Sequence, residues 1–295
     1  SDKTGTLTMN EMTVRRVYVD GRFVDVTGEG YIPEGQFESD GAAVSPDEDS
    51  TLGLLLRTGV LCNEASLVKR GQNYEIVGDP TEAALVVAAA KAGIDKESLQ
   101  HRLHRSCEIP FESEQQYMAV GYEEESRARV YVKGSVERLL SFCDTIMDDG
   151  EEVPLDDEAK AAILQATEKL AADAMRVIAL GVADFPSSPH KLKCNQFAGT
   201  LTFLGLAGMA DPPREEARLA IRQCRDAGIR VIMITGDHRA TAEAIAQQLD
   251  LPEGRTIEGR ELEKIADETV ATTPEQLSEW IAKVDHPSLK LPPMM

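Results

Sequence analysis

The run Asp-Lys-Thr-Gly-Thr at residues 2–6 combines the residue types that phosphoryl transfer requires. A carboxylate such as that of Asp2 can attack a phosphoryl group and form an acyl phosphate. Lys3 and the Thr4 hydroxyl can donate to phosphate oxygens, and Gly5 lets backbone N–H groups approach the same oxygens. The run therefore predicts a phosphoryl acceptor site, with a polar turn around a single aspartate as the simpler alternative.

Seven consecutive residues, 2–8, match the phosphorylation signature of the P-type cation-transporting ATPases. A chance match of this length is rare, so the motif is specific. With the motifs below, residues 1 to about 290 resemble the cytoplasmic catalytic loop of a type II, calcium-pump-like member of the haloacid dehalogenase superfamily. The resemblance implies that Asp2 accepts the γ-phosphate of ATP and that Asp2 and Thr4 hold Mg²⁺.

Position 4 bears on two alternative functions. Phosphatases of the same superfamily usually carry a second aspartate two residues after the nucleophile, where it acts as general acid and base, but this chain has Thr4. Without that carboxylate, water attacks an acyl phosphate slowly, which suits a pump. A soluble haloacid-dehalogenase-type phosphatase is one alternative, and a non-catalytic nucleotide-sensing module is another from a different class.

A second candidate segment follows an apolar run. Residues 229–234 are typical of a strand in a parallel sheet that is buried on both faces, and Thr235-Gly236-Asp237 follows directly. Doubly wound folds bind ligands at the carboxyl ends of such strands. A plain helix cap by Asp237 is the alternative. The resemblance implies that Thr235, Gly236 and Asp237 hold the phosphoryl group and that Lys290 neutralises it.

The stretch GDPTE at residues 78–82 precedes an apolar helix expected over residues 83–92. Asp79 is suited to cap this helix and Glu82 favours its positive end, so local structure alone explains both residues. The resemblance adds a second role, because pumps carry a similar stretch at the adenine site. Asp79 and Glu82 are therefore candidate nucleotide ligands, with helix capping as the alternative.

Other segments supply further nucleotide-binding candidates. The ring of Phe111 could belong to the core or stack on an adenine. Lys133 and Gly134 end an expected strand, where a cation and a close backbone approach suit a ligand; a surface lysine on a turn is the alternative. The resemblance implies that Phe111, Lys133 and Gly134 contact ATP and that Arg176 reaches its phosphates.

Two nearby positions depart from the pump pattern. Pumps usually carry a lysine where this chain has Gln116, and often an arginine where it has Ser113. Each replacement removes a positive charge from the expected nucleotide site. We therefore expect weaker nucleotide binding than in a typical pump.

The resemblance, together with the pattern of expected strands and helices, implies an α/β fold in two parts. One is an incomplete doubly wound parallel-sheet phosphorylation domain; the other is an inserted α+β nucleotide-binding domain built on an antiparallel sheet. The expected boundaries are 1–10 and 211–295 for the first and 11–210 for the second. Other expected elements are strands over residues 14–19 and 22–26 joined at Asp20-Gly21, an exposed loop over 28–50, and a helix over 52–66.

Composition excludes one class of partner. A formal net charge of -20 argues against nucleic-acid binding, which needs a basic surface. No apolar run approaches the ~18 residues that a membrane span needs. The five cysteines lack a CxxC pair, so we expect reduced thiols rather than a zinc site.

The resemblance also concerns the protein beyond this chain. It implies a membrane-embedded parent, with this segment on the cytoplasmic side and the transported cation, calcium as first expectation, bound by helices outside it. The strand before Asp2 and a later magnesium-binding stretch of the family are missing here. We therefore expect this segment to bind ATP but to phosphorylate itself poorly.

Overall fold

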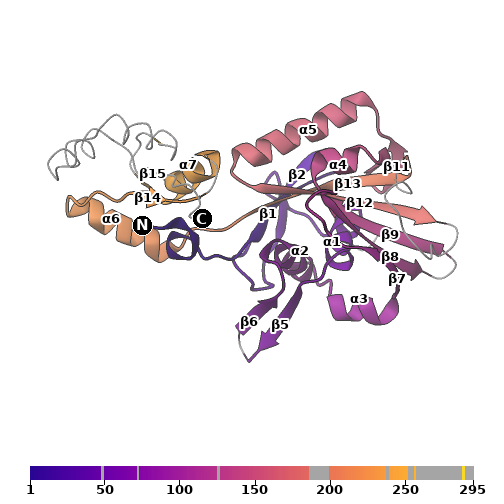
Figure 1. Cartoon of the computed structure of the whole chain (residues 1–295), viewed down its shortest axis with the longest axis horizontal. Coiled ribbons are helices and arrows are strands. Elements are labelled where there is room, and N and C mark those ends of the chain that lie inside the picture. The colour runs from indigo at the N-terminus through magenta and orange to yellow at the C-terminus, as the bar shows by residue number, and fades with distance from the viewer. Residues whose placement is uncertain are drawn as a thin grey trace. The chain divides into compact units, whose positions relative to one another are not determined.

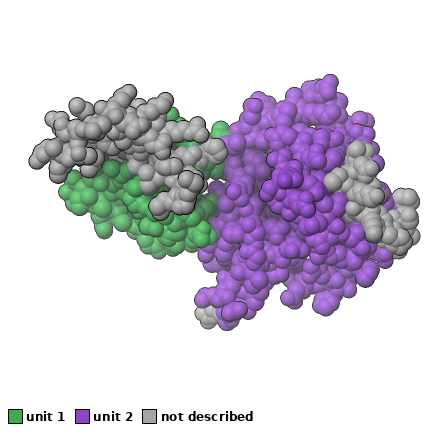
Figure 2. Space-filling view, in the orientation of Figure 1, with its two compact units in different colours: residues 1–10, 172–174, 211–295 green, residues 11–171, 175–210 purple. Residues whose placement is uncertain are grey.

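The computed structural model describes residues 1–47, 50–71, 73–124, 127–185, 199–236, 239–251, 256 and 288–289. The chain forms two compact units, which Figure 2 shows in different colours. Unit 1 comprises Ser1–Asn10, Ala172–Ala174 and Asp211–Met295, and unit 2 comprises Glu11–Ala171 and Met175–Ala210. Each unit has its own hydrophobic core.

Unit 2 is built on an 11-stranded sheet in which nine strands follow the order β4-β3-β2-β1-β13-β12-β9-β8-β7. These neighbours all pair antiparallel, while β10 pairs parallel with the first residues of β13 and antiparallel with β11. The strands are β1 (Thr13–Val19), β2 (Arg22–Val26), β3 (Phe37–Ser39), β4 (Ala42–Ala43), β7 (His104–Ile109), β8 (Tyr117–Glu124), β9 (Arg127–Gly134), β10 (Cys143–Asp148), β11 (Glu151–Pro154), β12 (Arg176–Phe185) and β13 (Leu201–Ala210).

Helices cover both faces of this sheet (Figure 1). One apolar cluster joins α1, α2 and α3 to one face, and a second joins α4 and α5 to the other. A separate hairpin of β5 and β6 lies beside α2. The bounds are α1 (Thr51–Leu61), α2 (Pro80–Lys91), α3 (Lys96–Arg102), α4 (Val136–Leu140), α5 (Asp157–Ala172), β5 (Ser66–Arg70) and β6 (Asn73–Val77).

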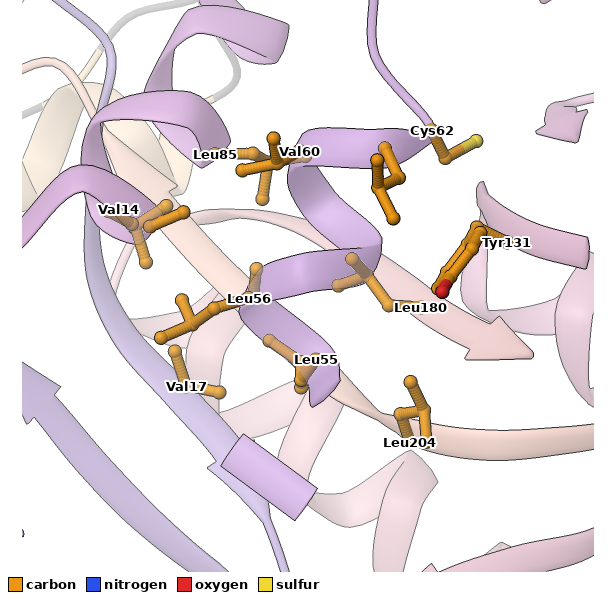
Figure 3. Packing of buried hydrophobic residues seen from close by; sticks show 14 of the residues in the cluster. Val14, Val17, Leu55, Leu56, Val60, Cys62, Leu85, Tyr131, Leu180 and Leu204 are labelled. Carbon is orange, nitrogen blue, oxygen red and sulfur yellow. The ribbon is translucent and has the colours of Figure 1, made fainter. Parts of the chain in front are cut away.

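The core under α1 is closely packed. Figure 3 shows Leu55 and Leu56 of α1 above Val17 of β1 and Leu204 of β13. All four side chains are at most 3% exposed. Burying an aliphatic side chain of this kind contributes about 1.5–3 kcal/mol. The packing therefore fixes the position of α1, whose last turn leads into the segment at residues 62–65.

The sequence predicted the hairpin of β1 and β2. Val19 pairs with Arg22, and the two residues between them, Asp20 and Gly21, have φ values of 50° and 68°. Positive φ at both central positions is the two-residue turn that matches strand twist, and glycine and aspartate adopt it more readily than most residues. The expectation of strands joined at this turn is confirmed.

Two expectations within unit 2 were wrong. The stretch 28–50, expected to be a loop, contains β3 and β4, because Phe37 is buried in the core and aligns β3 against β2. The helix expected over 52–66 ends at Leu61. Backbone groups beyond it bond to side chains instead, since the Ala65 N–H donates to Asn63 Oδ1 at 2.8 Å.

Unit 1 contains the loop Lys3–Leu7, α6 (Glu215–Asp226), β14 (Met233–Ile234), α7 (Arg239–Gln248) and β15 (Ser288–Leu289). Leu7, Ile221 of α6, Met233 of β14 and Leu249 form part of its core. β14 and β15 pair parallel. The strand expected over 229–234 forms only at its last two residues, and Ile229 is exposed, so this prediction was wrong over residues 229–232.

Within the described residues, no helix combines the length and apolarity that crossing a membrane would require.

We predict that Leu55→Ala lowers the free energy of unfolding of unit 2 by about 2–5 kcal/mol, because the cavity left between α1 and the sheet cannot be refilled. Urea denaturation followed by circular dichroism measures the change. Leu164→Ala is the matched control, since Leu164 on α5 is 43% exposed and should cost under about 0.5 kcal/mol. Equal losses in the two variants would contradict the described packing.

Candidate functional site

The segment that carries Asp2 lies beside β14. The Ile234 N–H donates to the Ser1 carbonyl oxygen at 2.8 Å, and Asp2 forms a parallel bridge with Ile234. On its other side Ile234 pairs with Leu289 of β15. Asp2 and Thr235 therefore lie at the carboxyl ends of neighbouring parallel segments, which is the edge where such sheets bind ligands.

The candidates at this edge differ in exposure. Asp2, Thr4 and Gly236 are exposed, whereas Thr235 is buried. Asp237 and Lys290, the other two candidates in unit 1, lie outside the described residues. The structure thus brings Asp2 and Thr235 to one edge and leaves the Asp2 carboxylate open to solvent.

The loop after Asp2 is held by the segment that enters α6. Gly5 has φ +75°, a conformation that glycine adopts without strain. The Thr8 hydroxyl donates to Asp211 Oδ2 at 2.6 Å. Arg214 donates from its backbone N–H to the Leu7 carbonyl at 2.8 Å and from Nε to the Thr8 carbonyl at 3.0 Å. Asp211 and Arg214 therefore fix the loop that positions Asp2.

Lys3 occupies a different environment from its neighbours. Its side chain is buried, and its carbonyl oxygen accepts a hydrogen bond from the Thr8 N–H at 3.0 Å. Lys3 thus belongs to the packing of the loop. Its predicted role as a donor to phosphate stays a prediction.

The exposed oxygens near Asp2 suit a magnesium ion only in part. Mg²⁺ prefers oxygen ligands and usually keeps several waters, with one or two carboxylates and substrate phosphates completing its shell. Asp2 and the Thr4 carbonyl or hydroxyl are oxygen donors of this kind. No group of three or more His, Cys, Asp or Glu residues in the described part of the chain could by itself enclose a metal ion. The residues present therefore fit a partial Mg²⁺ shell.

In unit 2 the central feature is an ion pair between Glu82 and Lys133. Lys133 lies at the end of β9 between Met118 and Leu180, with only 7% of its side chain exposed. Its Nζ donates to Glu82 Oε1 in the first turn of α2. Nearby, burial raises the pKa of the Cys62 thiol to about 11 even though the charge of Lys133 acts in the opposite direction. The pair therefore occupies a poorly hydrated site.

The second oxygen of Glu82 is bound by backbone groups. Glu82 Oε2 accepts from the N–H groups of Glu64 and Ala65 at 3.1 and 3.2 Å. The Asn63 side chain donates to the Glu82 carbonyl oxygen at 2.8 Å. One glutamate thus ties together α2, β9 and the segment Asn63–Ala65.

The first turn of α2 explains the local sequence. Asp79 Oδ1 accepts from the backbone N–H groups of Thr81 and Glu82 at 2.8 and 3.2 Å, which makes it the N-cap, with Pro80 at the first helical position. Arg176, the first residue of β12, donates to the Thr81 hydroxyl at 2.8 Å. The capping interpretation of Asp79 is confirmed, and Arg176 lies at the same helix end.

Gly134 and the end of β8 lie beside these groups. Tyr117 of β8 and Ala179 of β12 both pair with Gly134. A Cβ at position 134 would lie 2.5 Å from the Gln116 carbonyl oxygen and 2.7 Å from the Tyr117 Cβ, so only glycine fits. The register therefore gathers Gln116, Lys133 and Arg176 at one end of the sheet.

Phe111 lies in the connection from β7 to β8, and its ring is 57% exposed. Ser113 is in the same connection and is also exposed. Gln116 has φ +62°, and its carbonyl oxygen accepts from the Ser135 N–H at 2.9 Å. An exposed aromatic ring next to the Lys133 end of the sheet is available to a ligand, whereas the core alternative for Phe111 does not hold.

Sequence reasoning missed three residues of this cluster: Asn63, Thr81 and Lys96. Lys96 Nζ donates to the carbonyl oxygens of Asn63 and Ala65 at 2.8 and 2.5 Å. Thr81 is part of the GDPTE stretch, so the sequence pattern could have identified it. Asn63 and Lys96 carry no local signal, because their partners are backbone atoms distant in the sequence.

A family described as P-type ATPase, cytoplasmic domain N, matches residues 51–216, which is more than half of the chain. The chain belongs to the P-type ATPases. The match covers α1 to the start of α6, so it includes the whole Glu82–Lys133 cluster. A second family, described as the C-terminal part of the ACS/CODH beta subunit, matches residues 226–295, few of which the structure describes.

Curated P-type ATPases align along most of the chain. A cation-transporting ATPase of Synechocystis is 43% identical over 89% of this chain and 30% of its own length. The calcium-transporting ATPase of Bacillus subtilis is 38% identical over 92% and 31%. The human calcium-transporting ATPase type 2C member 1 is 34% identical over 96% of this chain and 29% of its own length, so this alignment extends into the stretch of the second family match. The chain spans about 30% of the length of these relatives.

We predict that Lys133→Met lowers the unfolding free energy of this P-type ATPase chain by about 3–5 kcal/mol, because it leaves the Glu82 carboxylate without its cation in a poorly hydrated site. Glu82→Gln and the double variant complete a thermodynamic cycle measured by urea denaturation. The loss of unfolding free energy in the double variant should be smaller than the sum of the two single losses by at least about 1 kcal/mol.

The control cycle uses Arg129 and Asp184, an ion pair across β9 and β12 in which the Asp184 side chain is 42% exposed. An exposed pair should couple by about 0.2–1 kcal/mol. A Glu82–Lys133 coupling no larger than this control would contradict the assignment of a poorly hydrated pair.

Proposed function

We propose that the chain is the ATP-binding and phosphoryl-accepting part of an ATP-driven cation pump. The observation that carries the proposal is the register at Ile234, which pairs Asp2 on one side and Leu289 on the other and so sets an exposed carboxylate beside Thr235. The relatives named as cation- and calcium-transporting ATPases support transport, with calcium as the first candidate ion. In the longer protein this part lies on the cytoplasmic side of a membrane.

The nucleotide is proposed to bind unit 2. Phe111 stacks on the adenine ring, because its side chain is exposed in the connection from β7 to β8. Lys133 and Arg176 supply positive charge to the phosphates, and Glu82 holds Lys133 in place. Gly134 lets the residues Gln116 and Tyr117 pack closely against the end of β9, and Asp79 fixes the first turn of α2. Gln116 and Ser113 add no charge, so the affinity for ATP is modest.

The phosphoryl acceptor is proposed to be Asp2 in unit 1, which we assign as a doubly wound phosphorylation domain over residues 1–10 and 211–295. An Asp2 oxygen forms a bond to the γ-phosphorus as the bond to the β–γ bridging oxygen breaks, and ADP leaves with that electron pair. The Thr235 hydroxyl and the N–H groups near Gly236 stabilise the charge on the transferred oxygens, with Asp237 and Lys290 completing the site. Mg²⁺, when bound through Asp2 and Thr4, neutralises phosphate charge.

Thr4 determines how long the acyl phosphate lasts after the transfer. A carboxylate at this position would activate water against the acyl phosphate, whereas a threonine provides no base. The aspartyl phosphate therefore persists long enough for the longer protein to change conformation. This property separates a pump from a phosphatase of the same superfamily.

We predict that the 295-residue chain binds ATP and that Lys133→Ala weakens binding at least about tenfold, which corresponds to 1.4 kcal/mol of lost interaction. Isothermal titration calorimetry measures both affinities. Asp2→Asn should leave the affinity unchanged within about a factor of two, because Asp2 belongs to unit 1. No detectable ATP binding by the unaltered chain would contradict the proposal.

The acceptor role is tested in a full-length transporter that contains this chain. Asp2→Asn should abolish the acid-stable, hydroxylamine-labile phosphoenzyme formed from γ-labelled ATP and should stop ion transport. A nucleotide sensor would keep its activity with the amide. Rapid hydrolysis of small phosphate esters by the unaltered chain would support the phosphatase instead.

A further inference from the structure

The Glu82 carboxylate is bound by donors from two directions. Lys133 donates to Oε1, and the backbone N–H groups of Glu64 and Ala65 donate to Oε2. The position of the carboxylate thus depends on β9 and equally on the segment Asn63–Ala65. A shift of this segment would move Glu82 and, through the ion pair, the Lys133 ammonium.

The segment Asn63–Ala65 belongs to no helix or strand. The Asn63 side chain bonds to the Ala65 N–H and to carbonyl oxygens of α1 and α2. The carbonyl oxygens of Asn63 and Ala65 both accept from Lys96 Nζ, at 2.8 and 2.5 Å. Lys96 therefore holds the two residues that flank the Glu64 peptide.

The place of Lys96 in the sequence is electrostatically unfavourable. It is the first residue of α3, where the helix dipole disfavours a cation. Its ammonium group is also partly withdrawn from water, and burial is the largest cause that lowers its pKa below the ordinary lysine value of 10.5. Two short hydrogen bonds to carbonyl oxygens offset these costs.

We propose that Lys96 is a positioning residue of the nucleotide site: it fixes the segment Asn63–Ala65, which aims Glu82 and thereby Lys133 at the bound nucleotide. The proposal rests on the nucleotide-binding role of unit 2. Lys96 itself does not contact the nucleotide. Its influence passes through the backbone carbonyl oxygens to which its ammonium group donates. A neutral side chain of similar length cannot replace it, because it lacks this charged donor.

The charges around Lys96 determine how pH acts on it. Glu82 of α2 and Glu64 of the segment favour its protonated form, and Lys133 of β9 and Arg105 of β7 disfavour it. As pH rises toward 10.5, Lys96 loses its charge and its hydrogen bonds to the two carbonyl oxygens weaken. The contribution of Lys96 to nucleotide affinity should therefore disappear with rising pH.

Lys91 provides a matched control. It ends α2, is also partly buried, and donates to the carbonyl oxygens of Thr27 and Gly28 at 2.7 and 3.2 Å. Burial lowers its pKa to about 8. Lys91 thus shares the chemistry of Lys96 but holds the segment at residues 27–28, which makes no described contact with Glu82 or Lys133.

The test measures the Kd for ATP by calorimetry at several pH values from about 7 to about 10, for the unaltered chain, Lys96→Met and Lys91→Met. We expect Lys96→Met to weaken binding about tenfold at neutral pH. The ratio of its Kd to that of the unaltered chain should fall toward one as pH rises. Lys91→Met should keep a ratio within about twofold of one at every pH.

A ratio near one at neutral pH for Lys96→Met, a ratio that does not change with pH, or an equal loss in Lys91→Met would overturn the proposal. Failure of the unaltered chain to bind ATP would instead overturn the proposed function. If Lys96→Met does not fold, Lys96→Arg decides the question. Because arginine stays protonated, this variant should retain affinity at about pH 10 where the unaltered chain loses it, and parallel profiles would overturn the proposal.

Discussion

The ion pair between Glu82 and Lys133 is the interaction on which the geometry of unit 2 depends. A cation at the end of a central strand would be costly to bury alone, and so would a carboxylate in the first turn of α2. Together they join a helix, a strand and the segment Asn63–Ala65 with hydrogen bonds on both carboxylate oxygens. Apolar packing places α1 and α2 on the sheet. The Glu82–Lys133 ion pair fixes their position at the end of the sheet that carries the candidate nucleotide-binding residues.

A pair with this geometry leaves part of the lysine available. An ammonium group has three donors, and the bond to Glu82 uses one. Under the proposed function, nucleotide phosphates would share Lys133 with Glu82. The carboxylate keeps the ammonium oriented before any ligand arrives, so less conformational entropy is lost on binding.

Features that depend on neighbouring residues could be predicted from the sequence. The Asp20-Gly21 turn and the Asp79 cap follow from local turn and helix-cap chemistry. The seven-residue motif around Asp2 likewise identified the family, which the comparisons confirm. In each case the signal lies within a few residues of the feature.

Other features depend on contacts between distant segments and could not be predicted. Nothing near Phe37 indicates that it is buried and that β3 extends the sheet. The end of α1 at Leu61 is followed by bonds of Ala65 to Glu82 and Lys96, which lie 17 and 31 positions further along the chain. The burial of the Lys3 side chain has no local signal either, since a lysine in a polar run is usually exposed.

The net charge of -20 makes the few buried cations important for an anionic ligand. Acidic side chains on the surface repel ATP, but salt and water screen them over about 10 Å. Lys133 lies in a poorly hydrated site, where a charge acts more strongly than at the surface. The charges of Glu82, Lys133 and Arg105 all act on Lys96. In the proposed nucleotide site, cations held in place by backbone oxygens and by Glu82 would offset the repulsion between an acidic protein and a tetra-anionic nucleotide.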